Sequence, residues 1–176
     1  ALGNADSAIL TTLAPGAYTA QVSGANNTQG VVLIEVYDLS PASTAQKLFN
    51  ISTRATAGTG DATLTAGIVV TGNASKRVMI RAVGPGLNQF GLTGTLPSPV
   101  LVLTNQAGQT VATGSNWSAS ADAAAITAAS AQAGAFPMVA GDAAMIVNLA
   151  PGAYTAQVTD ATGASGVALV EVYELP

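Results

Sequence analysis

Short runs of alternating apolar and polar residues, separated by turn residues, fill most of the chain beyond Lys47. Leu64 to Val70 and Val78 to Val83 are two such runs, and Gly72 to Ser75 supplies the turn between them. Each run predicts a half-buried strand, because successive side chains of a strand point to opposite faces of the sheet. About eight or nine short strands with frequent turns predict an all-β fold, a β-sandwich of jelly-roll type.

One stretch, from Ala119 to Gln132, is rich in alanine and does not alternate. Ser118 or Ser120 is a suitable N-cap, Asp122 falls in the first turn, and Gly134 follows the end of the stretch. These features predict a single short helix within the sandwich. The apolar strand positions predict a core made of Ile68, Val70, Val78, Ile80, Val100, Leu103, Met145, Val147, Tyr154, Val158, Val170 and Val172.

The chain contains an internal repeat. Residues 6–39 align with residues 142–175 without a gap at an offset of 136, with 20 identities in 34 positions. The chain therefore divides into a partial repeat of the last three strands (1–39), a linker rich in Pro, Ser, Thr and Ala (40–46), and a complete unit (47–176).

The last strand of each copy is apolar on both faces. In the second copy one face has Ala168, Val170 and Val172, and the other has Val167, Leu169, Glu171 and Tyr173. A strand on the surface of a two-layer sandwich would show a polar face to water, so both faces are expected to be covered. The cover is either the alanine-rich helix or a neighbouring unit. The first copy has no such helix in its sequence.

Composition excludes several kinds of site. Only 8% of residues are charged, and the chain has no histidine and no cysteine, where about 25% charged residues is usual. Imidazole bases, thiol nucleophiles, disulfides and zinc sites of His and Cys are therefore excluded. The net charge of −4 with five basic residues argues against a nucleic-acid partner. No apolar run is long enough to predict a membrane span, and nothing predicts a cofactor.

The few charges in apolar surroundings predict structural pairs. Arg54, Arg81 and Glu171 occupy strand-like segments, and a charge there must be paired or partly wet. Glu171, Asp142 or Asp61 would supply the carboxylate of such a pair. No base or nucleophile accompanies these residues, so we expect no enzymatic activity.

Other polar features give weaker signals. Asp61, Asp122 and Asp160 lack the closely spaced oxygen ligands of a calcium loop. Trp117 is either a sugar-stacking platform or a residue at the edge of the core. Glycosylation sequons occur at Asn26, Asn50, Asn73 and Asn116.

Several strings resemble one known type of unit. NISTR at 50–54, Gly60-Asp61, IRAVGP at 80–85, Asn116-Trp117 and PGAYTAQV at 151–158 are similar to the β-rich repeat of large secreted and surface proteins of bacteria. The resemblance implies an extracellular location and a structural or adhesive role, and it carries over no catalytic residue. Ser115 departs from the pattern, because an acidic residue is expected before Asn116-Trp117 in such units.

Two functions follow as hypotheses. The first is a structural subunit of an extracellular bacterial filament or surface assembly, a homopolymer joined head to tail through the partial repeat. Its subunit contacts would involve Val31, Leu33, Tyr37, Leu169 and Tyr173. The alternative is an adhesin or carbohydrate-binding sandwich from a longer tandem-repeat surface protein, with a surface glycan as its partner.

Overall fold

The structure is a computed structural model that describes residues 3, 6–41 and 47–176. The chain separates into two units, Ala1–Lys47 and Leu48–Pro176. Most of the expected linker, residues 42–46, lies outside the described residues.

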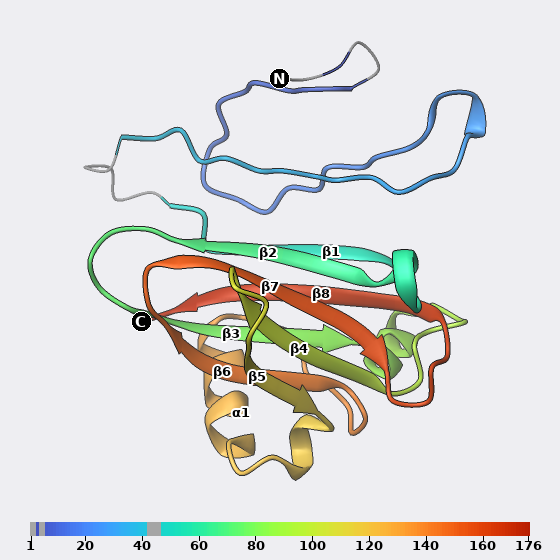
Figure 1. Cartoon of the computed structure of the whole chain (residues 1–176), viewed down its shortest axis with the longest axis vertical. Coiled ribbons are helices and arrows are strands. Elements are labelled where there is room, and N and C mark those ends of the chain that lie inside the picture. The colour runs from blue at the N-terminus through green and yellow to red at the C-terminus, as the bar shows by residue number, and fades with distance from the viewer. Residues whose placement is uncertain (1–2, 4–5, 42–46) are drawn as a thin grey trace. The chain divides into compact units, whose positions relative to one another are not determined.

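The second unit contains eight strands, one α-helix and three short 3₁₀ helices (Figure 1). Turn residues end most of the strands, as expected where glycine and asparagine cluster between apolar runs. The strands are β1 (Asn50–Ala57), β2 (Leu64–Val70), β3 (Lys76–Val83), β4 (Pro99–Asn105), β5 (Thr110–Ser115), β6 (Ala143–Leu149), β7 (Gly152–Asp160) and β8 (Gly166–Leu175). The helices are η2 (Gly60–Ala62), η3 (Pro85–Phe90), η4 (Trp117–Ala119) and α1 (Ala123–Gln132).

The strands form two four-stranded sheets with the orders β1-β8-β3-β6 and β2-β7-β4-β5. All pairs within the sheets are antiparallel. Successive strands thus alternate between the sheets except at β4–β5, and β8 and β7 insert between β1 and β3 and between β2 and β4. This strand order is that of a jelly roll, and it confirms the predicted all-β sandwich.

The core lies between the two sheets. Val78, Ile80 and Ala82 point inward from β3, and Leu101 and Leu103 face them from β4. Burying a side chain of this size stabilises the fold by about 1.5–3 kcal/mol. Four expected core residues are only half-buried and pack at the margin of this core: Ile68, Val147, Tyr154 and Val172. The expected core residue Val100 is also half-buried, but it alternates with the inward-facing Leu101 and Leu103 and is not part of this core.

A second apolar cluster lies on the outer face of the first sheet, beneath α1. Ile126 and Ala129 of the helix pack against Met79 of β3 and Tyr173 of β8. The helix of the same unit therefore covers the second apolar face of β8. The helix starts four residues later than expected, because Trp117–Ala119 forms a 3₁₀ turn.

The first unit forms no strand within its described residues, and its one regular element is the 3₁₀ turn η1 (Ala25–Asn27). Figure 1 shows it as a trace without arrows that turns back at η1. Three strands were expected between residues 6 and 39. The residues of the second copy that align with them, 136 positions later, are called their twins, and they form β6, β7 and β8. These three strands pair only with β1 to β4, and the first unit has no counterpart of those four strands.

Candidate functional site

A buried ion pair lies on the outer face of the first sheet. Arg81 of β3 and Glu171 of β8 stand opposite each other in register, and they are 0% and 4% exposed. The Arg81 Nε atom is 3.0 Å from Glu171 Oε2, without the alignment of a hydrogen bond. The Tyr173 hydroxyl donates a hydrogen bond of 2.8 Å to Glu171 Oε1.

Aromatic rings enclose the guanidinium group. The Arg81 Cζ atom lies 4.6 Å from the centroid of the Phe136 ring and 5.9 Å from that of Tyr173. Phe90 contacts the Phe136 ring edge-on, with centroids 5.0 Å apart. The two Nη atoms make no hydrogen bond within the described residues. Contact with the rings therefore adds to the attraction between the cation and the Glu171 carboxylate.

Burial controls the protonation of this cluster. It raises the pKa of Glu171, although Arg81 and the Tyr173 hydroxyl act in the opposite direction. Burial also raises the pKa of Tyr173, and the neighbouring Glu171 carboxylate adds to this effect. The Arg81–Glu171 pair links β3 to β8 at one register position of the sheet.

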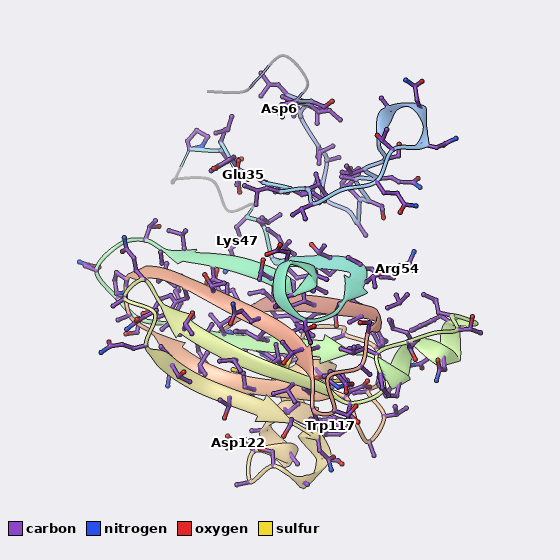
Figure 2. The ribbon with its side chains drawn as sticks, turned by 45° about the vertical axis from the view of Figure 1, so that its right-hand side comes forward. Asp6, Glu35, Lys47, Arg54, Trp117 and Asp122 are labelled. Atoms are coloured by element: carbon purple, nitrogen blue, oxygen red, sulfur yellow. The ribbon has the colours of Figure 1, made fainter. Side chains whose placement is uncertain are left out.

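The other two residues expected in charge pairs have different surroundings. Arg54 lies exposed on β1, opposite Leu169 (Figure 2), and forms no ion pair with any described residue. Asp142 is fully buried, but its contacts are backbone amides rather than an arginine. The expectation that Asp142 pairs with a cation therefore does not match its surroundings.

Asp142 holds together the loops at one end of the sandwich. Its Oδ1 atom accepts hydrogen bonds from the amides of Gly84 (3.0 Å) and Gly86 (3.1 Å), and its Oδ2 atom accepts one from Val139 (2.9 Å). A Cβ atom at Gly86 would collide with the Asp142 carboxylate and with Val83. Glycine is thus needed at position 86 for the backbone to reach the carboxylate.

Asp160, at the end of β7, also accepts hydrogen bonds from loop residues. From the sequence it is weighed only as a calcium ligand. It accepts hydrogen bonds from the amides of Ser98 (2.7 Å) and Thr162 (2.8 Å) and from the Thr162 hydroxyl (2.6 Å). Burial by itself would raise the pKa of Asp160. The hydrogen bonds from Thr162, Ser98 and Ala164 together outweigh burial, and the pKa is lowered.

This lowered pKa predicts a dependence of stability on pH. The contribution of Asp160 is present above the ordinary pKa of 3.8 and is lost as the pH falls through the lower folded value. We expect Asp160→Asn to cost about 1–2 kcal/mol at pH 6 and less at pH 2.5. Urea unfolding of both proteins at the two pH values measures this difference. A cost that stays constant across this range would contradict the assignment.

The expected contact residues divide between the two units. Val31, Leu33 and Tyr37 are exposed by 89%, 79% and 72%. Their twins in β8 are covered within their own unit, since Leu169 is half-buried and Tyr173 is only 5% exposed. Of the expected contact residues, those of the first copy are therefore the ones accessible to a partner.

A groove of about 430 Å³ runs along the side of the sandwich between the edge strands β5 and β6. Ser115, Asn116, Ser120 and Asp122 give it polar groups, and Met145 forms part of its floor. Trp117 lies nearby (Figure 2), but its ring packs toward α1 and its indole N–H donates to the Val139 carbonyl at 2.9 Å. Trp117 therefore acts as a residue at the edge of the core.

Neither metal ligation nor a membrane span is indicated by the described residues. They contain no group of three or more acidic side chains placed to hold a metal ion. No helix among them has the length and apolar character needed to cross a membrane.

No protein-family model matches the sequence, and no curated protein is similar to it. Among solved structures, the chain is similar to the pre-peptidase C-terminal domain of a collagenase from Bacillus anthracis. The identity is 15%, the match covers 70% of this chain and 89% of that one, and the TM-score is 0.43. A likeness of this degree carries no argument about function.

Proposed function

We propose that this protein is a structural subunit of an extracellular bacterial filament or surface assembly, joined head to tail through residues 6–39. One observation carries the proposal. The segment Val31–Tyr37 has the two-sided apolar pattern of β8, a central strand, yet its side chains are exposed. An unpaired apolar segment of this kind recruits other strands.

The complete unit offers places for such an association. Its two sheets end in the edge strands β1, β6, β2 and β5, whose outer backbone groups have no ladder partner in the described residues. An extended segment that binds to such an edge gains main-chain hydrogen bonds, and it also buries alternate side chains. A contact between unlike surfaces does not close on itself unless its rotation permits, so it favours a filament.

Sequence features support the location and the role. The strings at 50–54, 80–85 and 151–158 resemble units of secreted and surface proteins of bacteria. The low content of charged residues, 8%, lets subunits pack closely while few ions are buried. The ion pair and the two buried aspartates are all used within the sandwich, so the proposal includes no catalysis.

Replacing Leu33 and Tyr37 together by serine should reduce assembly. The double variant removes two exposed apolar side chains, and we expect the fraction of protein in filaments to fall at least about tenfold. Electron microscopy and sedimentation measure it. The control is Val139→Ser, which removes an exposed apolar side chain from the loop before β6, outside the edge strands. A full chain that stays monomeric at high concentration, or a 1–39 deletion that assembles normally, would refute the proposal.

A second candidate function is binding of a surface glycan. The groove between β5 and β6 favours it, since Asn116, Ser120 and Asp122 place amide, hydroxyl and carboxylate groups along one depression. Titration with neutral oligosaccharides, followed by fluorescence of Trp117, tests this candidate. Saturable binding that Asp122→Ala abolishes would support it, whereas an unchanged signal at millimolar sugar would exclude it.

A further inference from the structure

Residues 6–39 carry the sequence of three strands that do not pair with one another. In the complete unit β6 pairs with β3, β7 lies between β2 and β4, and β8 lies between β1 and β3. Two of the three twins need a partner strand on each side. The segment therefore cannot form a sheet of this type alone, and its missing partners are of the β1 to β4 type.

We propose that residues 6–39 are the last three strands of a second jelly roll, and that their partner is a further copy of the β1–β5 stretch. This inference goes beyond the proposed function: the segment remains a coupling element, but its partner is a further β1–β5 stretch and not a sheet edge of a complete unit. One polypeptide would then contribute to two neighbouring jelly rolls, the first through residues 6–39 and the second through residues 48–176.

Local contacts of the two copies already agree. The Tyr18 hydroxyl donates to the Ala14 carbonyl at 2.9 Å, as the Tyr154 hydroxyl donates to the Ala150 carbonyl at 2.9 Å. Likewise the Tyr37 hydroxyl donates to Glu35 at 3.0 Å, as Tyr173 donates to Glu171. These two tyrosine contacts are therefore formed in both copies, although the long-range partners are present for the second copy alone.

The long-range contacts of the twins identify those partners. Glu171, the twin of Glu35, lies against Arg81 of β3. Asp142, the twin of Asp6, accepts the amides of Gly84 and Gly86. In the first copy Asp6 and Glu35 are exposed and labelled in Figure 2, and Asp6 accepts a hydrogen bond from Gly3. A partner that completes both must carry an arginine in its third strand and a Gly-Pro-Gly loop after it.

The chain has more β6–β8 segments than β1–β5 stretches, so the partner of residues 6–39 must be an additional β1–β5 stretch. Residues 1–176 hold two segments of the β6–β8 type for one β1–β5 stretch, and β6, β7 and β8 already occupy that stretch. A filament made only of this chain leaves one segment per subunit without a jelly roll to complete. Completion therefore requires a further β1–β5 stretch, which distinguishes it from binding to a sheet edge.

An extended chain tests the inference directly. Residues 41–141 are joined to Asp6, in place of residues 1–5, so that the natural junction between 141 and 142 is reproduced. We expect amide hydrogen exchange across residues 6–39 to slow by about 100-fold relative to the unextended chain. Residues 48–176 of the same molecule serve as the folded reference. If that unit is protected and residues 6–39 still exchange rapidly, the inference fails.

Asp6→Ala provides the specific control. In the extended chain it removes the acceptor for the Gly84 and Gly86 amides of the added copy, so exchange in residues 6–39 should accelerate at least about tenfold. In the unextended chain the same substitution should have no effect, because Asp6 is exposed there. An equal effect in both chains would overturn the inference.

A second arm covers the case in which the extended chain does not fold. The unmodified chain is refolded with a separate fragment of residues 41–141, and native mass spectrometry records a one-to-one complex or its absence. A complex supports the inference, and its absence overturns it. Assembly of the unmodified chain alone is scored separately by electron microscopy, so failure of the proposed filament is distinguishable. If residues 6–39 become protected from amide hydrogen exchange when the chain assembles without the fragment, the segment binds a sheet edge. That result would refute the completion of a second jelly roll.

Discussion

Replacing Asp142 by alanine is expected to lower the free energy of unfolding of the jelly roll by about 3–5 kcal/mol. The carboxylate is fully buried and accepts the amides of Gly84, Gly86 and Val139. Alanine leaves these three donors without an acceptor, and each buried unsatisfied donor costs about 1–3 kcal/mol. The loss is a large part of the total stability of a domain, about 5–15 kcal/mol.

Urea unfolding followed by circular dichroism measures this loss. Asp6→Ala is the matched control, since it removes the same side chain from the twin position in exposed surroundings. We expect the control to change stability by less than about 0.5 kcal/mol. Asp142→Asn should fall between the two, because an amide keeps one acceptor oxygen but places an NH₂ group against a backbone donor. A loss below about 1 kcal/mol for Asp142→Ala would show that the loops close without the carboxylate.

Arg81→Met is expected to cost about 3–5 kcal/mol at pH 7, because it leaves Glu171 buried without a cation. The double variant Arg81→Met with Glu171→Gln should recover most of this loss, since it removes the isolated charge as well. The pattern expected is therefore a large cost for the single change and a small one for the pair. A double variant no more stable than Arg81→Met would contradict the ion-pair assignment.

The loss of stability caused by Arg81→Met should depend on pH. Burial raises the pKa of Glu171, and Arg81 opposes that rise, so removal of Arg81 raises the pKa further. A carboxyl group whose folded pKa is raised favours the fold below its ordinary pKa of 4.5, and this contribution is lost as the pH rises through the folded value. Arg81→Met should thus be closer to the parent protein at pH 4 than at pH 7. Thermal unfolding at both pH values measures the difference.

The sequence alone predicted the class of fold and the single helix. These features depend on local chemistry. Alternation of side chains indicates a strand, an alanine-rich stretch indicates a helix, and glycine or asparagine marks the turns. The two-sided apolar pattern of residues 167–173 likewise showed that this strand is covered on both faces, though not by which element.

Tertiary structure decided the roles of the buried charges. Asp142 and its two glycine partners lie 58 and 56 residues apart in sequence, and only the folding of the jelly roll brings them together. Because the partners of Asp142 are backbone amides, the sequence gives no sign of these contacts apart from the two glycines. The sequence predicted that the face of β8 with Tyr173 is covered, and only the tertiary structure identified α1 as the element that packs on it.

The two copies of the repeat show this division within one molecule. Residues 142–175 form three strands, whereas residues 6–39, with 20 identities in 34 positions, form none in the described part. Local contacts such as those of Tyr18 and Tyr154 are the same in both copies. The difference comes from pairing, because a strand is stable only when neighbouring strands satisfy its backbone groups and bury its side chains. Sequence determined the capacity of each copy to become strands, and the presence of β1 to β4 decided which copy did.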